Sequence, residues 1–256
     1  MPSPAARSGR RSLALALCAV SAGACGGGVP LLHPAHVLSP GAVSAGAGLS
    51  GQPVLLTLPH APESTEGRAE ALLQERTVAP ALAPWASVRV GIPGSNEVGL
   101  AYAGRALRLD GRHAFKLSKK VSLSAGLGGE LLLIGRPRAD AAGSPTSVLG
   151  GGFDVPVLVG WTSTGGLYSA WIGPRVGLSW ITGEIPAAFG AAEATDVSGQ
   201  HVRTGLVAGL RAGFRHVHVA LELGGDWHHV TGTLGGAPVA FDQLSLTPAG
   251  GLVLSF

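Results

Sequence analysis

The chain has 256 residues, is low in charge (13% Asp, Glu, Lys and Arg) and contains 41 glycines. Three of its 18 basic residues, Arg7, Arg10 and Arg11, precede the apolar stretch 12–24, and without them 15 basic residues balance 15 acidic ones. Balanced charge gives no electrostatic basis for nucleic-acid binding. No later run approaches the roughly 20 apolar residues of a membrane-spanning helix, which argues against a helical membrane protein.

The chain begins with MPSPAARSGRRSLALALCAVSAGAC, which has the order of a secretory signal: basic residues, an apolar core, then small residues before a cut. We predict a signal peptide at 1–24 and cleavage before Cys25. The residues Ala22-Gly23-Ala24-Cys25 resemble a lipobox, with Ala22 where leucine is usual. That resemblance implies that Cys25 is a lipid anchor. The same residues also spell a signal-peptidase site, which would leave a free thiol.

The mature chain is predicted to have an N-terminal periplasmic segment at 25–40, followed by a β-barrel at 41–256. Within the barrel region, 51–84 is rich in proline and contains one helix-like stretch, Glu66 to Arg76, at helical spacing. We expect 51–84 to form a long outer loop. A short capping helix and a partly disordered loop both remain open for it.

Period-two alternation of apolar and polar residues dominates the chain after position 85. In 243–256, for example, four leucines and Phe256 share one face, whereas Gln243 and Ser245 fall on the other. The pattern predicts an all-β, antiparallel up-and-down transmembrane barrel with about ten strands, although eight or twelve are also compatible. The predicted strands are 42–50, 85–92, 97–103, 106–115, 120–133, 152–162, 167–181, 200–214, 217–230 and 243–256.

The connections between these strands alternate in length, as in outer-membrane barrels with short periplasmic turns and long outer loops. A tight reversal near Gly104-Arg105 is the exception on the long-loop side. This parity places both chain ends on the periplasmic side. The short turns are 93–96, 116–119, 163–166 and 215–216, and the long connections are 51–84, 134–151, 182–199 and 231–242.

Aromatic residues at outward-facing positions gather near the two ends of the predicted strands, where amphipathic rings favour the membrane interface. Four of the thirteen aromatics, Trp85, Trp171, Phe189 and Phe241, do not follow this arrangement. The predicted outer belt is Tyr102, Phe153, Trp180 and Trp227, and the periplasmic belt is Phe115, Trp161, Tyr168, Phe214 and Phe256.

The closing strand, with Gly251, Leu254 and the terminal Phe256, resembles the C-terminal signal that the outer-membrane barrel assembly machinery reads. Ala249 stands where that signal has a polar residue. The run SVRVGIPGSNEVGLAYAGRALRLDGRHAF is similar to the start of many outer-membrane barrels of Gram-negative bacteria. The resemblance covers 85–256 and implies an outer-membrane location, contact with outer-membrane lipid and assembly by that machinery.

The inward-facing positions collect charged residues of both signs, whereas outward strand positions carry no Lys, Arg, Asp or Glu. Buried charges persist when they are paired and hydrogen-bonded, so we predict a charge-balanced network that fills a narrow lumen. The predicted members are Arg89, Glu97, Arg108, Asp110, Arg112, Glu130, Asp154, Arg175, Arg203, Arg211, Glu222 and Asp226.

Asp226 and His228 are the only catalytic candidates of note, because both face inward about 7 Å apart along one strand and an acid can orient an imidazole that activates water. Omptin proteases use a similar Asp-x-His pair, but the Asp-x-Asp pair that they also need has no counterpart here. Lipid-A-modifying barrels use Ser and His, and the His-x-Ser spacing is absent at His216 and His218. A structural role for Asp226 and His228 is therefore favoured.

These observations predict an outer-membrane barrel of structural, interaction or narrow-pore type, without a cofactor, a metal or catalysis. Two alternatives remain. One is an outer-rim hydrolase, a protease or lipid-A-modifying enzyme, that uses Asp226 and His228. The other is a secreted lipocalin-like binder.

Overall fold

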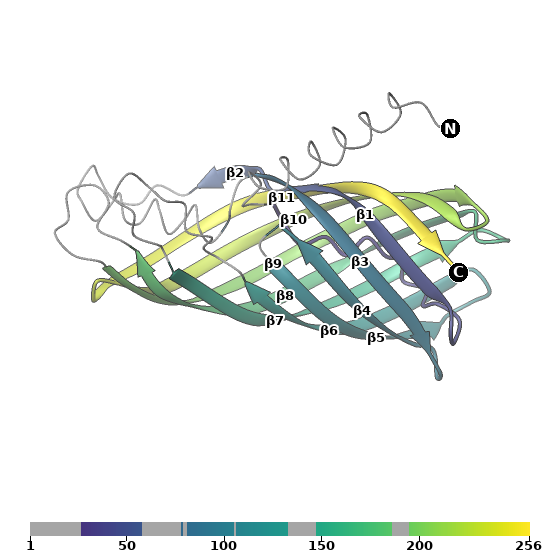
Figure 1. Ribbon diagram of the computed structural model, residues 1–256, viewed down its shortest axis with the longest axis horizontal. Helices are drawn as coiled ribbons and strands as arrows, with labels where there is room; N and C mark the ends of the chain where they lie inside the picture. Colours follow the sequence, from purple (N-terminus) through teal and green to yellow (C-terminus); the bar gives the residue numbers. More distant parts are fainter. Residues whose placement is uncertain (1–26, 58–77, 79–80, 105, 133–146, 186–194) are drawn as a thin grey trace, which may run out of the picture.

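The computed structural model describes residues 27–57, 78, 81–104, 106–132, 147–185 and 195–256. These residues form eleven β-strands in one antiparallel sheet (Figure 1). Among them no helix is long and apolar enough to cross a membrane. The strands are β1 (Val43–Gly51), β2 (Val54–Thr57), β3 (Leu82–Ile92), β4 (Asn96–Ala103), β5 (Ala106–Lys116), β6 (Val121–Leu132), β7 (Ser147–Thr162), β8 (Tyr168–Ile185), β9 (Thr195–Phe214), β10 (Val217–Leu234) and β11 (Ala237–Ser255).

The sheet closes into a barrel because β1 pairs with β3 on one side and with β11 on the other. Val43 and Phe256 exchange backbone hydrogen bonds at the short-turn end of this seam. This end is predicted to be periplasmic and is called the periplasmic end below, and the opposite end is called the outer end. Further along β11, Ser245 and Gln243 pair with β2 instead. β2 therefore continues β1 after an interruption at 52–53. Because β1 and β2 occupy one position in the wall, the barrel is ten-stranded. The predicted fold class is confirmed.

The periplasmic ends of the strands agree with the predicted bounds to within one residue, whereas β7–β11 run four to six residues further at their outer ends. The expected long connection at 231–242 is wrong: β10 and β11 continue to a two-residue turn, Gly235-Gly236, with φ of 58° and 82°. Positive φ at both central residues is the hairpin geometry that glycine permits. The helix-like stretch 66–76 and Phe189 lie outside the described residues.

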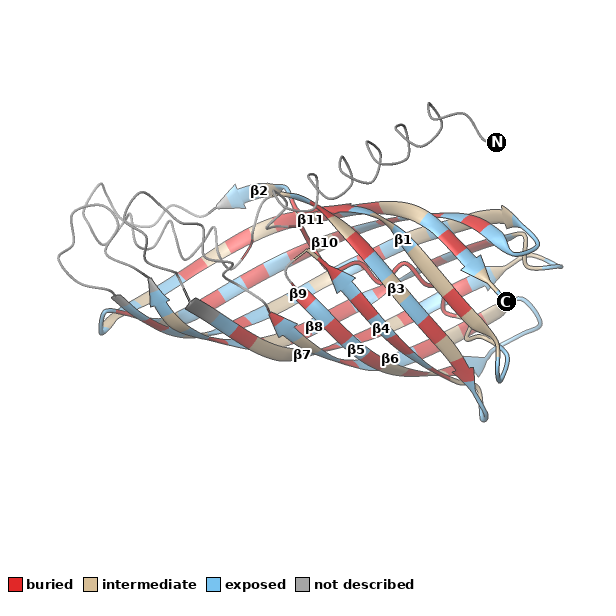
Figure 2. Cartoon of the chain, viewed as in Figure 1, coloured by how far each residue is buried: buried red, intermediate tan, exposed pale blue. Residues whose placement is uncertain are grey.

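Burial alternates along every long strand, so that small or charged residues face the lumen and large apolar ones face outward (Figure 2). Every aromatic of the two predicted belts is exposed, whereas Trp85, Trp171 and Phe241 are buried. Glu184 and Asp196 are exposed too, but they lie beyond Trp180 on the outer extension of the wall. An apolar band bounded by aromatic residues is the exterior of a transmembrane barrel.

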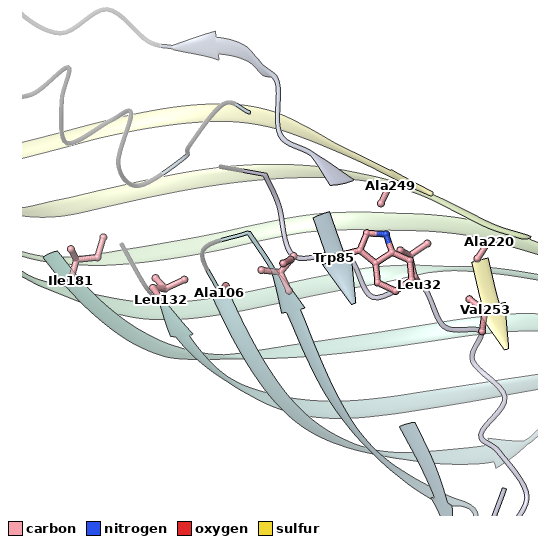
Figure 3. Packing of buried hydrophobic residues seen from close by; sticks show 10 residues of the cluster. Leu32, Trp85, Ala106, Leu132, Ile181, Ala220, Ala249 and Val253 are labelled. Carbon is pink, nitrogen blue, oxygen red and sulfur yellow. The ribbon is translucent and has the colours of Figure 1, made fainter. Parts of the chain in front are cut away.

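The segment that precedes β1 lies inside the barrel. Residues 27–35 are buried, although they form neither a helix nor a strand. Leu32 packs beside Trp85 of β3 in a cluster that includes Val29 and Val253 (Figure 3). Trp85 has room because a Cβ on Gly46 or Gly251 would lie 2.8 Å from its ring. Of the segment 25–40, predicted to be periplasmic, the structure describes 27–40, and residues 27–35 of it are buried in the lumen.

The apolar exterior gives a depth-dependent prediction. Leu221, 51% exposed, lies on β10 between the two aromatic belts, and Leu221→Arg should lower the free energy of unfolding from lipid vesicles by about 2–4 kcal/mol. Leu149 is 58% exposed but lies beyond Phe153. The matched variant Leu149→Arg should cost about 0–1 kcal/mol. Equal losses in urea titrations would contradict this placement of the apolar band.

Candidate functional site

The periplasmic half of the lumen is lined by an ion-pair cluster from β3, β4 and β5. Arg89 Nε donates to Glu97, and its Nη1 donates to Asp110 Oδ1 at 3.2 Å. Arg112 Nη2 lies 2.8 Å from Glu97 Oε1. Glu97 and Arg112 are direct cross-strand partners. Two arginines therefore neutralise one glutamate while a second acid, Asp110, holds the other side of Arg89.

Arg108 links this cluster to a second one further around the wall. Its Nη1 lies 2.9 Å from Asp110 and its Nε lies 2.8 Å from Asp154 of β7. Arg175 of β8 approaches Asp154 at 2.8 Å and Glu130 of β6 at 2.9 Å. Arg203 of β9 also reaches Glu130, at 3.1 Å. The ion pairs thus form one continuous network from β3 to β9.

Glycines opposite the charged residues make this network fit. A Cβ on Gly99 would lie 2.6 Å from the Arg89 guanidinium, and one on Gly128 would lie 2.7 Å from Arg108. The glycine-rich inward face is thus complementary to bulky guanidinium groups. Because glycine has no side chain, a glycine on one strand leaves a volume that an arginine of the neighbouring strand occupies.

Nine of the twelve residues predicted for the lumen network make these ion pairs. The other three are used differently. Glu222 binds the N-terminal segment. Asp226 accepts a 3.4 Å hydrogen bond from Thr247 Oγ1. Arg211 is half-buried near the periplasmic end of β9, and its Nε makes no hydrogen bond within the described residues.

The main chain of the N-terminal segment is held by side chains of the wall. The Glu222 carboxylate accepts the N–H groups of Leu31 and Leu32, each at 2.7 Å, and the Trp171 indole N–H at 3.1 Å. Arg175 Nη1 donates to the Val29 carbonyl at 2.7 Å. Polar groups removed from water must find such partners, and here charged residues supply them.

The same segment is bound at both of its ends. Towards the periplasm, Arg112 donates to the carbonyls of Pro34 and His36, and Glu97 accepts the Leu38 N–H at 2.9 Å. At the other end Ser50 Oγ donates to the Gly28 carbonyl at 2.9 Å. Arg112, Glu97 and Arg175 therefore serve both the ion-pair network and the segment inside it.

His228, the proposed partner of Asp226, contacts a serine and a second histidine through its two ring nitrogens. His228 Nε2 lies 2.7 Å from Ser245 Oγ, and His228 Nδ1 lies 2.8 Å from His201 Nε2. Ser179 Oγ lies 3.2 Å from His201 Nδ1. The chain Ser179–His201–His228–Ser245 thus crosses four strands. Alternation places all four residues inward, but only the strand register brings them together.

A small cavity of about 30 Å³ lies beside this chain, with room for one or two water molecules. Its lining includes Gly28, Glu130, Ser179, His201, Arg203 and His228. Within the described residues no group of three or more His, Cys, Asp or Glu side chains could hold a metal ion. This part of the lumen is therefore a packed polar core with a small polar cavity in it.

Comparison with known proteins finds no matching family model and no matching curated protein. Similar solved structures include Neisserial surface protein A (10% identity, 85% of this chain and 98% of that chain, TM-score 0.32). Ail, the attachment invasion locus protein of Yersinia pestis, is 11% identical over 84% of this chain and 99% of that chain, with a TM-score of 0.24. The CymD monoaromatic hydrocarbon channel is 10% identical over 86% and 89%, with a TM-score of 0.28.

The chain's own strand pairing, apolar exterior and filled lumen define its class, an outer-membrane β-barrel fold.

The ion-pair network predicts a strong asymmetry between buried and exposed acids. Asp154 is fully buried between Arg108 and Arg175, so Asp154→Asn leaves cations uncompensated and should cost about 3–5 kcal/mol of unfolding free energy. Asp242, which accepts from His229 on the outer surface, provides the matched control. Asp242→Asn should cost about 0–1 kcal/mol in the same titration, and a similar loss in both variants would argue against a structural network.

Proposed function

We propose that this protein is an exported outer-membrane barrel whose lumen is sealed by its own N-terminal segment, and that it acts as a structural or interaction protein without catalysis. The observation that carries the proposal is the placement of residues 27–38, whose backbone is bound by Glu222, Arg175 and Arg112. We infer that the side-chain network and the segment within it together close the lumen to ions.

The predicted export signal supports this location. We propose that 1–24 is removed before Cys25, that the barrel assembly machinery recognises the strand ending in Phe256, and that outer-membrane lipid surrounds the apolar band. In the structure, Leu254 and Phe256 are exposed on the outside of the closing strand. A secreted lipocalin-like binder is disfavoured, because its large apolar side chains would face the interior rather than the surroundings.

Planar-bilayer recording tests the sealed lumen. The full mature protein should show no stable single-channel conductance, because the segment and the ion pairs occupy the lumen. Deletion of 27–38 should produce small conductance steps in protein that still migrates differently before and after heating, as folded barrels do. Large, stable channels from the undeleted protein would overturn the proposal.

A second candidate function, an outer-rim hydrolase, is favoured by one observation. Ser245 Oγ lies 2.7 Å from His228 Nε2, and His201 contacts the other nitrogen of that imidazole. A serine hydrogen-bonded to an oriented histidine is the arrangement of an activated nucleophile. Arg203 Nε, which has no hydrogen-bond partner among the described residues, lines the neighbouring cavity as a donor. This candidate replaces Asp226 by Ser245 as the partner of His228.

Labelling with a fluorophosphonate, which attaches to activated serines with loss of fluoride, separates the two functions. Since Ser245 is fully buried, the sealed barrel should show no adduct by mass spectrometry, and Ser245→Ala should match the unchanged protein. Ser179→Ala is the control for the other end of the hydrogen-bonded chain. An adduct on Ser245 that His228→Ala abolishes would establish the hydrolase instead.

A further inference from the structure

The N-terminal segment runs along the lumen without reversing, with its later residues at the periplasmic end and its earlier residues at the outer end. Near the periplasmic end His36 Nδ1 contacts Thr162 Oγ1 at 2.9 Å, next to the β7–β8 turn. Midway, Leu31 and Leu32 bind Glu222, which lies six residues beyond the β9–β10 turn. At the other end Gly28 N–H approaches the Gly51 carbonyl, where β1 ends.

Gly27 lies at the level of the outer aromatic belt. A Cβ on Gly27 would lie 2.8 Å from the Cβ of Ala83. Ala83 is two residues outward of Trp85, which pairs with Ala103 beside the belt residue Tyr102. The segment from 38 to 27 therefore runs from the level of Glu97, near the periplasmic end of β4, to the level of the outer aromatic belt.

The lumen recognises this segment mainly by its backbone. The carbonyls of Gly28, Val29, Pro34 and His36 and the N–H groups of Leu31, Leu32 and Leu38 all bind wall side chains. Pro30 and Pro34 carry no backbone N–H, which removes two donors that would otherwise need partners in the lumen. The lumen is thus a built site for an irregular, proline-containing peptide.

We infer that the barrel threads its own N-terminus through this site and presents it at the extracellular mouth. The inference rests on the proposed membrane orientation. Two residues of extended chain span at most about 7 Å, so a chain cut before Cys25 begins close to Gly27. An apolar band about 25 Å tall separates that position from the periplasmic side. A lipid on Cys25 would therefore be on the outer side of the membrane.

Epitope insertion tests the direction of threading. One epitope is inserted after Gly26, a second between Ser39 and Pro40, and a third between Gly235 and Gly236 in the outer hairpin. An antibody cannot cross the outer membrane of intact cells. The first and third epitopes should bind antibody on intact cells with no gain on permeabilisation, whereas the second should bind only after permeabilisation.

The three insertions separate failure of the inference from failure of the proposed function. A Gly26 epitope that is silent on intact cells while the hairpin epitope is stained overturns the threading. A hairpin epitope that is silent on intact cells overturns the proposed orientation instead. Heat-modifiable migration of each variant reports that its barrel is folded.

A disulfide tests the threading without any insertion, should an insertion prevent folding. A Cβ on Gly28 would lie 3.2 Å from Thr247 Cβ, close to the spacing of a disulfide. In a Cys25→Ser background, Gly28→Cys with Thr247→Cys should oxidise to an internal crosslink seen by mass spectrometry. Gly28→Cys with Ser44→Cys, on the periplasmic part of β1, should stay reduced. Absence of the first crosslink in folded protein contradicts the threaded position.

Discussion

Glu222 makes the interaction on which the rest of the lumen depends. One carboxylate accepts two consecutive backbone N–H groups, from Leu31 and Leu32, and the indole N–H of Trp171. Because a buried acceptor without donors would be costly, and the donors would be equally costly without it, the wall and the segment each complete the other. The consequence is a barrel whose polar interior is satisfied only when its N-terminal segment is inside. Arg175 extends this dependence, since it holds Asp154 and the Val29 carbonyl at once.

The barrel inverts the usual distribution of residues, and the inversion explains its composition. Outward positions hold leucine, valine and aromatic side chains, while the interior combines arginine, acids and glycine. Glycines such as Gly99 and Gly128 provide the space into which guanidinium groups extend. A high glycine content is therefore part of the packing. A one-sign lining would favour ion passage, but here the lining pairs with itself and with the enclosed backbone.

Much of this fold could be predicted from the sequence, because alternation reports directly on which positions face lipid. It identified every strand except β2, which lies within the predicted loop 51–84, and it identified the short turns, both aromatic belts and the inward acids and arginines. Alternation no longer predicts the structure in segments whose side chains do not face lipid. At 231–242 the wall extends beyond the outer aromatic belt and the apolar alternation fades, so the sequence predicts a long loop where the chain forms a two-residue hairpin turn. Residues 27–38 have no period, and their location depends on partners far away in sequence. His228 was placed inward correctly, but its contacts with Ser245 and His201 depend on register across three strands.

The enclosed segment also constrains how the molecule can be built. Residues 39–42 connect it directly to β1, and β1 is the strand that closes the barrel against β11. Once that seam has formed, a chain end held at several points along the lumen cannot be inserted from the side. The contacts of the segment with Glu222 of β10 and Arg175 of β8 can form from the side only while the sheet is still open between β1 and β11. Covalent continuity through 39–42 keeps the segment next to that seam throughout.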